Sequence, residues 1–350
     1  MEFEGASIGV YVHRKERQQS LWGHPEPIRS IELTANPWHL SLLKKLINQA
    51  MQFSVEQDRS MLQIYQMSNS YWRPWDKAAS KEPRAFDTVI LDQDTANDIL
   101  ADAKKFVSME ERTYYMKRGI PYHRGYLFYG PPGTGKTSFA QALAGSIKST
   151  PMDICLLNLA SQNLDDAKLN TSLRYAPKNA IILLEDVDAV FVQRSSASLI
   201  AQDSSRPGNK PSGVSFSGLL NAIDGVASQE GRIFIMTTNH PEKLDPALVR
   251  DGRCDRKWEF GNCSSEQLRR MFKISFRDLR ANQPVDDLAA AFAKQIAANS
   301  MAPAAIQGYL LPHRDPREAA DPKNVQVWLV KTDKNKAVKH VTLEDHLRKV

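Results

Sequence analysis

Residues 130–137 read Gly-Pro-Pro-Gly-Thr-Gly-Lys-Thr, and this stretch decides the fold of the chain. It directly follows the apolar run Tyr126–Tyr129, and the apolar residues of Ser138–Ile147 fall on one helical face. A glycine-rich turn between a strand and a helix points successive backbone N–H groups toward an anion, and the helix adds its positive N-terminal end. The stretch therefore predicts a P-loop that binds a nucleoside triphosphate.

The residue types within the loop predict distinct contacts with ATP and Mg²⁺. Lys136 is expected to reach the β- and γ-phosphates, and the hydroxyl of Thr137 is expected to bind the metal ion. The predicted nucleotide-binding residues of the loop are Gly130, Pro131, Pro132, Gly133, Thr134, Gly135, Lys136, Thr137 and Ser138.

Two acids follow the apolar run Ile181–Leu184. A buried strand with carboxylates at its end suits phosphoryl transfer, in which one acid holds Mg²⁺, usually through water, and the next polarises the attacking water. By position we assign Glu185 to the metal and Asp186 to the water. The side chain of Asp186 is one methylene shorter than that of glutamate, so a partial exchange of these roles stays open.

A third apolar strand, Ile233–Met236, ends in Thr-Thr-Asn. An amide at the end of a strand beside the P-loop can contact the γ-phosphate or the attacking water. We therefore predict that Asn239 belongs to the same site.

Two arginines follow in a loop that contains a glycine. Arg250 and Arg253 stand three residues apart, which suits charge supplied to the γ-phosphate of a neighbouring subunit. On spacing alone, a surface ion pair with Asp251 or Asp255 is an equally good interpretation.

The composition is that of an ordinary globular protein. The 350 residues carry a formal net charge of +6 spread along the chain, which favours a mildly basic, solvated surface and does not by itself indicate a dedicated nucleic-acid surface. The three cysteines contain no C-x-x-C pair, which predicts a reducing compartment without disulfides or a zinc site. No stretch reaches the roughly 18–20 apolar residues of a membrane span, and no signal-peptide pattern is present, so we expect a soluble chain.

The chain divides into three predicted domains. Residues 1–84 contain short β-like runs and one helical stretch, which predicts a small β-rich (α+β) domain that ends in a polar linker at Asp76–Arg84. In residues 85–262 apolar strands alternate with helices, which predicts an α/β fold with a parallel, three-layer sheet. Residues 263–350 predict a helical C-terminal subdomain with a basic tail. Residues 194–213 are rich in Ser, Gly and Pro and predict a mobile insert.

These motifs together resemble the AAA ATPases over about residues 85–275. Four stretches are more specific: RGIPYHRGYLFYG (118–130), IILLEDVDAVF (181–191), SFSGLLNAIDGVAS (215–228) and TTNHPEKLDPAL (237–248). They resemble one branch of that class, the mitochondrial AAA proteins of the bcs type, which translocate the Rieske iron–sulfur protein during complex III assembly. In that family the Glu-Asp order found at 185–186 is usual.

The resemblance implies a homo-oligomeric ring, heptameric in that family, that hydrolyses ATP with Mg²⁺ between its subunits. It makes Arg250 and Arg253 candidates for the arginine finger, and it places Ile120 where the family's adenine pocket forms. It also implies a protein cargo, for which it suggests the Rieske protein, and a matrix-facing location at the mitochondrial inner membrane. The family has a transmembrane helix before its own β-rich domain, and residues 1–84 resemble the second of these parts only.

The leading hypothesis is thus an ATP-hydrolysing chaperone or translocase. Two alternatives stay open: a nucleotide-binding scaffold with little turnover, and a nucleic-acid-dependent ATPase. Asp251 replaces the family's usual proline and adds a negative charge beside the arginines. The loop Ala160–Lys168 contains no aromatic residue and no glycine, so we do not expect an unfoldase that threads peptides.

Overall fold

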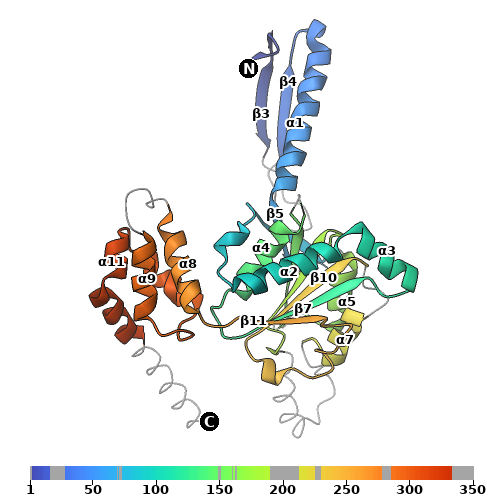
Figure 1. The fold of residues 1–350 in the computed structure, drawn as a ribbon. Helices are drawn as coiled ribbons and strands as arrows, with labels where there is room; N and C mark the ends of the chain where they lie inside the picture. Colours follow the sequence, from blue (N-terminus) through green and yellow to red (C-terminus); the bar gives the residue numbers. More distant parts are fainter. Residues whose placement is uncertain are drawn as a thin grey trace, which may run out of the picture. The chain divides into compact units, whose positions relative to one another are not determined.

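The computed structural model contains two compact units, Met1–Met61 and Leu62–Val350, which we describe separately (Figure 1). The residues that it describes are 2–15, 28–68, 70, 73–148, 151–159, 161, 164–189, 213–224, 230–277 and 285–332. The predicted insert at 194–213, apart from Gly213, and the predicted tail beyond residue 332 lie outside the described residues.

The larger unit is built on a seven-stranded sheet with the strand order β11-β7-β10-β9-β8-β5-β6. Its strands are β5 (Leu62–Met67), β6 (Trp75–Lys81), β7 (His123–Tyr129), β8 (Asp153–Asn158), β9 (Ala180–Glu185), β10 (Arg232–Thr238) and β11 (Arg256–Glu259). All neighbouring strands are parallel except β5 and β6. The predicted α/β class with a parallel sheet is confirmed.

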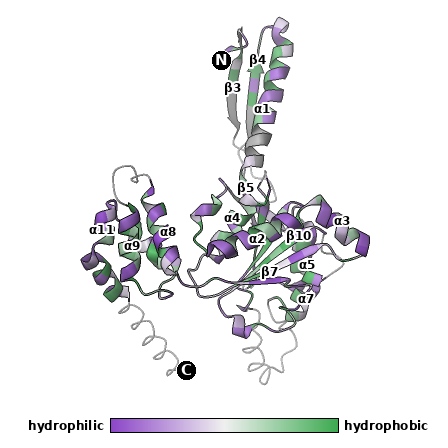
Figure 2. Ribbon diagram, viewed as in Figure 1, coloured by the Kyte–Doolittle hydropathy of each residue, from purple (hydrophilic) through white to green (hydrophobic). Residues whose placement is uncertain are grey.

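Successive side chains of a strand point to opposite faces of a sheet, so the buried strands contribute to a core on each face. In β9, Ile181 and Leu183 join the core on one face, while Ile182 and Leu184 join the core on the other. Helices α2 (Gln93–Phe106) and α4 (Lys136–Ser146) cover the first face, and α5 (Asp166–Tyr175) and α7 (Phe216–Asp224) cover the second. Near-continuous apolar runs such as β10, which is green in Figure 2, are typical of parallel strands covered on both faces. The described residues of this region also form η2 (Phe86–Thr88), α3 (Met109–Arg118) and η3 (Pro241–Lys243).

The parallel order brings the carboxyl ends of β7, β10 and β9 to one edge of the sheet. In the register, Thr238 lies opposite Tyr129, and Met236 lies opposite Leu184. The P-loop follows β7, the two acids end and follow β9, and Asn239 follows β10. The groups predicted for the site therefore meet at the carboxyl edge, where parallel sheets commonly bind ligands.

The polar linker predicted at Asp76–Arg84 is wrong for most of its length. Residues Trp75–Lys81 form β6, which pairs with β5 at the outer edge of the sheet, and β5 in turn pairs with β8. The stretch looks like a linker because edge strands tolerate lysines and other polar residues, which discourage further pairing. The contacts consequently divide the chain after Met61, whereas the sequence places the domain boundary at residue 84.

The C-terminal region of the larger unit is helical, as predicted. It contains α8 (Ser265–Ser275), α9 (Val285–Gln295), α10 (Pro303–Leu310), α11 (Pro316–Ala320) and a helical stretch at 322–332. At the start of α8, the backbone N–H of Gln267 donates to Ser264 Oγ (3.3 Å) and that of Ser264 donates to Gln267 Oε1 (2.8 Å), which forms a capping box. The core of this region includes Phe272, Phe292 and also Ile90, which precedes α2.

The smaller unit has the α+β character expected of it. Short strands β1 (Glu2–Phe3) and β2 (Ala6–Ser7) pair with each other, and β3 (Gly9–Lys15) pairs antiparallel with β4 (Ile28–Thr34). After η1 (Pro37–His39), the chain continues into α1 (Leu40–Ser60).

At Gly125, in β7, the loop that precedes β11 passes so close to the strand that there is no room for a side chain. A Cβ at Gly125 would lie 1.8 Å from the carbonyl oxygen of Arg253, and the N–H of Asp255 holds the two segments together by donating to Gly125 O (2.9 Å). We expect Gly125→Ala to lower the free energy of unfolding by about 3 kcal/mol, because backbone atoms cannot move aside as a flexible side chain can. Urea denaturation measures this. In the control, Gly261→Ala, the added Cβ meets no atom within 4 Å, so equal losses in the two variants would contradict the explanation.

Candidate nucleotide site

The P-loop connects β7 to α4 at the carboxyl edge of the sheet. Gly133 and Gly135 have φ values of +80° and +92°, a backbone region that costs other residues about 1–2 kcal/mol. Gly135 is also the N-cap of α4 and has no side chain to cap the helix. The N–H groups of the first turn are thus available to an anion, and the helix dipole favours one there.

The ammonium group of Lys136 is held within this loop. Its Nζ donates to the carbonyl oxygens of Gly130 (2.7 Å) and Pro131 (2.9 Å) and to Oδ1 of Asn239 (2.8 Å). Burial lowers the pKa of Lys136, while nearby carboxylates, Asp186 first among them, oppose this shift. The structure therefore brings Lys136 and Asn239 together, although they are far apart in the sequence.

Thr137 and Glu185 form a second contact in the site. The hydroxyl of Thr137, in the first turn of α4, donates to Oε1 of Glu185, at the end of β9, over 2.7 Å. Both groups present the hard oxygen atoms that Mg²⁺ prefers, and Mg²⁺ commonly binds through one or two protein groups together with nucleotide phosphates. Within the described ranges, no three His, Cys, Asp or Glu side chains are grouped so that they could hold a metal. The pair fits an Mg²⁺ ion that binds together with a nucleotide.

Asp186 has an unusual backbone, with φ at +50°. Such a conformation is uncommon for a residue with a side chain and persists where neighbours hold it. Here the N–H of Asp186 donates to Thr237 Oγ1 (3.3 Å), and that of Val187 donates to Thr237 O (3.0 Å). The Asp186 carboxylate accepts a hydrogen bond from Asn239 Nδ2 (3.2 Å). The amide of Asn239 consequently joins Lys136 to Asp186.

These groups line a cavity of about 320 Å³. Its lining residues are Pro132, Gly133, Gly135, Lys136, Thr137, Ser138, Glu185, Asp186, Thr237 and Asn239. Of the other predicted loop residues, Gly130 and Pro131 bind Lys136 through their carbonyl groups, and the hydroxyl of Thr134 donates to Pro131 O (2.8 Å).

A second cavity, of about 240 Å³, shares Gly133, Gly135 and Ser138 with the first. Thr134 of the P-loop also lines it, and segments that are distant in sequence supply the rest of its lining: Arg84, Thr88, Val89, Ile90, Met271, Ile274, Ser275, Pro303, Ala304 and Gln307. A partly apolar pocket beside a phosphate cradle fits a nucleobase. The sequence alone does not indicate that these residues form a pocket, because its only signal there is an apolar run that ends just before α2.

Ile120 is not among the residues that line either cavity. Its side chain is 44% exposed, and its N–H donates to Tyr115 O at the end of α3 (3.2 Å). Ile120 precedes β7 and so lies at the amino edge of the sheet, whereas the P-loop follows the same strand at the carboxyl edge. The structure does not bring Ile120 to the pocket, and Val89 and Ile90 line it instead.

The two arginines differ in their surroundings. Arg253 is 7% exposed, and its Nε donates to Asp224 Oδ2 (2.7 Å) while its Nη1 donates to Ala247 O (2.5 Å). The side chain of Arg250 is 62% exposed, and its Nη2 lies 3.6 Å from the same Asp224 oxygen. The acid that pairs with both arginines is therefore at the end of α7, and is neither of the two loop acids that the spacing suggested.

Both arginines lie far from the cavity of their own chain. The carbonyl of Arg253 packs against Gly125, and Tyr129, which precedes the P-loop, is about 13 Å further along β7 at the usual rise of a strand. Asp224 ends α7, the helix that connects parallel strands β9 and β10 and so returns toward the amino edge. Arg250 and Arg253 therefore lie toward the opposite edge of the sheet from Lys136.

A phosphate cradle at the carboxyl edge of a parallel sheet, with a base pocket completed by a helical lid, is the arrangement of the AAA ATPases, a class of ATP-hydrolysing enzymes. Comparison with protein-family models agrees: "ATPase family associated with various cellular activities (AAA)" matches residues 126–262. Two further models, "Mitochondrial chaperone BCS1-like, ATPase lid domain" and "BCS1 N terminal", match residues 265–322 and 1–89. The chain belongs to the BCS1 family of AAA ATPases.

Individual relatives support this assignment. Mitochondrial chaperone BCS1 of Homo sapiens is 39% identical over 291 residues, which cover 83% of this chain and 66% of the human protein. Probable mitochondrial chaperone BCS1-A of Dictyostelium discoideum is 36% identical over 313 residues, which cover 89% of this chain and 71% of that protein. Probable mitochondrial chaperone bcs1 of Schizosaccharomyces pombe is 41% identical over 272 residues, 78% of this chain and 57% of that protein. The chain thus spans just under two thirds of the human relative's length. Among the described residues, no helix has the length and apolar character needed to cross a membrane.

Proposed function

We propose that this chain is an ATP-hydrolysing chaperone or translocase of the complex III assembly type, which moves or remodels a protein as a homo-oligomer. The observation that carries the proposal is that the residues proposed to bind the nucleotide and the exposed arginine proposed to act on it lie toward opposite edges of the sheet. Lys136, Glu185 and Asp186 line the cavity at the carboxyl edge, while the exposed Arg250 lies toward the amino edge. A second copy of the chain would bring its Arg250 to the γ-phosphate and complete the site.

Each side chain of the cavity has a position that supports a role in hydrolysis. Lys136 neutralises charge on the β- and γ-phosphates from within the P-loop. Thr137 and Glu185 would hold Mg²⁺, which would neutralise phosphate charge, and their mutual contact supports Glu185 as the metal-side acid. Asp186 accepts the proton of the attacking water, and Asn239 orients Asp186 relative to Lys136.

Similarity to the relatives supports the proposed location in the cell. The relatives are named mitochondrial chaperones, and we extend this to a mitochondrial protein at the matrix face of the inner membrane. The resemblance adds a heptameric ring and the Rieske iron–sulfur protein as cargo. Neither the size of the ring nor the identity of the cargo is derived from the geometry of the nucleotide site.

Two inactive variants should restore activity when they are mixed. Asp186→Asn removes the carboxylate that activates water but still presents Arg250, whereas Arg250→Ala keeps the cavity and has no arginine to offer. Each variant alone should hydrolyse Mg-ATP at least about a hundredfold more slowly than the wild type. In random assembly about a quarter of the interfaces combine an intact cavity with an intact arginine, so an equimolar mixture should recover up to that share of the wild-type rate.

The same phosphate-release assay distinguishes the alternatives. The wild-type rate per subunit should climb and then saturate as protein concentration increases. A mixture as inactive as its two components would contradict completion of the site by a second copy. ATP binding without turnover at any concentration would support the scaffold, and strong stimulation by DNA or RNA would support a nucleic-acid-dependent ATPase.

A further inference from the structure

Arg253 is bound within its own subunit through every nitrogen of its guanidinium group. Nε and Nη2 bond to Asp224, and Nη1 bonds to the carbonyl of Ala247. Hydrogen bonds that involve charged groups are stronger than those between neutral groups, and withdrawing Arg253 would leave the Asp224 carboxylate without this partner. Arg253 is therefore poorly suited to reach into another subunit.

Arg250 contacts the same carboxylate loosely. Its Nη2 lies 3.6 Å from Asp224 Oδ2 and most of its side chain is exposed to screening by solvent, so this ion pair stabilises little. Little is lost when Arg250 turns toward another anion. Its backbone, by contrast, is tied to the anchored arginine, because the N–H groups of Arg253 (3.2 Å) and Cys254 (3.1 Å) both donate to Arg250 O.

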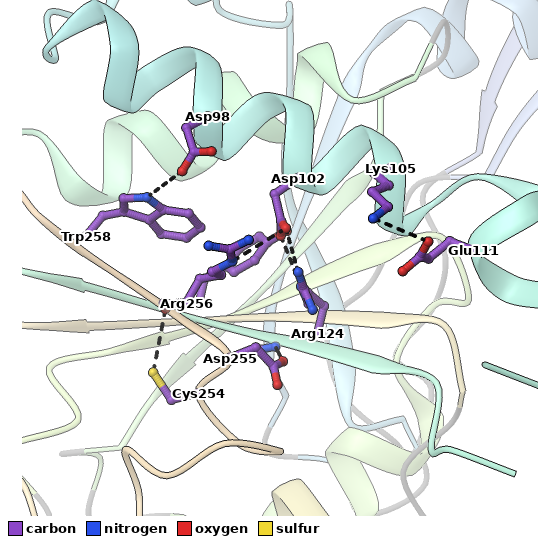
Figure 3. Close-up of polar contacts among 11 residues, drawn as sticks. Asp98, Asp102, Lys105, Glu111, Arg124, Cys254, Asp255, Arg256 and Trp258 are labelled. Atoms are coloured by element: carbon purple, nitrogen blue, oxygen red, sulfur yellow. Dashed lines mark hydrogen bonds and ion pairs between the residues drawn. The ribbon is translucent and has the colours of Figure 1, made fainter. Parts of the chain in front are cut away.

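The chain after these arginines is fixed to the sheet and to α2. Asp255 Oδ2 accepts a hydrogen bond from the N–H of Gly125 (2.8 Å). In Figure 3, Arg124 of β7 and Arg256 of β11 point toward Asp102 of α2; Arg124 Nε lies 3.0 Å and Arg256 Nε lies 3.7 Å from its carboxylate oxygens. Although burial opposes it, the hydrogen bond from Arg124 helps to hold the pKa of Asp102 below its usual range. These contacts hold the C-terminal end of the loop that carries Arg250 and Arg253 against the sheet and α2.

We infer that Asp224 and Arg253 form an anchor that positions Arg250, and that Arg250 alone enters the nucleotide site of the neighbouring copy. Asp224 and Arg253 are positioning residues under this inference. The inference rests on the proposed function, since it concerns the arginine that completes a second copy's site. It departs from the sequence-based prediction, which treated the two arginines as equivalent.

The mixed assembly isolates the role of the arginine donor. The recipient is Arg250→Ala, whose cavity performs the hydrolysis, and the donor is Asp186→Asn with one further substitution. Asp224→Asn removes the charge of the anchor at nearly constant shape, and Arg253→Lys keeps the charge but loses the fork that binds Asp224 and Ala247. Asp251→Asn is the matched control, since it makes the same acid-to-amide change at an exposed residue of the same loop.

We expect the Asp224→Asn and Arg253→Lys donors each to lower kcat of the mixture by about ten- to a hundredfold, because a misplaced catalytic group reacts slowly. The KM for ATP should change less than about twofold, since the cavity that binds the measured ATP belongs to the unaltered recipient. A donor with both substitutions should be no worse than either alone, because the two residues act as one unit. The Asp251→Asn donor should match the parent donor, and an Arg250→Ala donor should give no activity.

The opposite pattern would overturn the inference. If Arg253 itself enters the neighbouring site, Arg253→Ala in the donor should abolish activity as fully as Arg250→Ala does, and Asp224→Asn should preserve or increase activity by releasing Arg253. If the parent mixture is active and the Asp224→Asn donor supports it fully, the anchor fails while the proposed function stands. If the parent mixture is inactive, both fail. A donor that no longer binds ATP or assembles is replaced by the Arg253→Lys donor, which tests the same contact.

Discussion

Replacing Lys136 with alanine should weaken ATP binding about 10²–10⁴-fold. The ammonium group lies within the P-loop, where it donates to Gly130, Pro131 and Asn239, and we propose that it meets the β- and γ-phosphates of bound ATP. Loss of two charge-assisted hydrogen bonds weakens binding by about 3–6 kcal/mol, which corresponds to about 10²–10⁴-fold in Kd. Isothermal titration of the purified protein with Mg-ATP measures this change directly.

A second lysine provides the control for this experiment. Lys148 follows α4, and its Nζ donates to Asn179 Oδ1 (2.8 Å) at an exposed site outside the cavity. Lys148→Ala should bind ATP like the wild type. If Lys136→Ala retained micromolar affinity, the assignment of the phosphate site to this loop would have to be abandoned.

Replacing Asp186 with asparagine should stop turnover while leaving ATP binding within a few-fold of the wild type. The amide oxygen can still accept the hydrogen bond from Asn239 Nδ2, so the geometry around Lys136 is kept. The amide cannot accept a proton from water, and loss of a general base lowers kcat by about 10²–10⁴-fold. Phosphate release and a parallel titration with ATP separate the two effects.

Two observations would revise this assignment. Glu242→Gln makes the same chemical change at an exposed acid beyond Asn239, outside the cavity, and should leave kcat unaltered. If Asp186→Asn hydrolysed ATP at the wild-type rate, the catalytic carboxylate would be Glu185, which accepts the hydroxyl of Thr137. The positive φ of Asp186 would then reflect the turn alone.

The phosphate half of the site could be predicted from the sequence because its parts are local. Lys136 and Thr137 follow β7, Glu185 ends β9 and Asp186 follows it, and Asn239 follows β10. Each apolar run predicts a strand, and each polar group stands at its end. Parallel pairing then brings the three ends together whatever the rest of the chain does.

The base pocket and the arginine contacts could not be predicted in this way. The pocket combines Val89, Ile274 and Pro303 from segments that no local pattern connects, and Ile120, which the resemblance suggested, lies elsewhere. From the spacing alone, the expected partners of Arg253 were the two acids of its own loop, Asp251 and Asp255. The bound acid is Asp224, which is 29 residues away and reaches it only because α7 returns to the amino edge of the sheet.

The sequence by itself determined the class of fold, the P-loop, and the acids and amide that accompany it, because strand periodicity and strand-end chemistry are properties of neighbouring residues. Tertiary structure alone decided that the polar stretch Trp75–Lys81 is an edge strand, which residues line the base pocket, and which arginine is buried and which is exposed. These outcomes depend on which distant segments pack together and exclude water from one another. Arg253 is consequently buried and bonded to Asp224, while Arg250 is exposed and lies 3.6 Å from the same acid, although the two arginines are three residues apart in the chain.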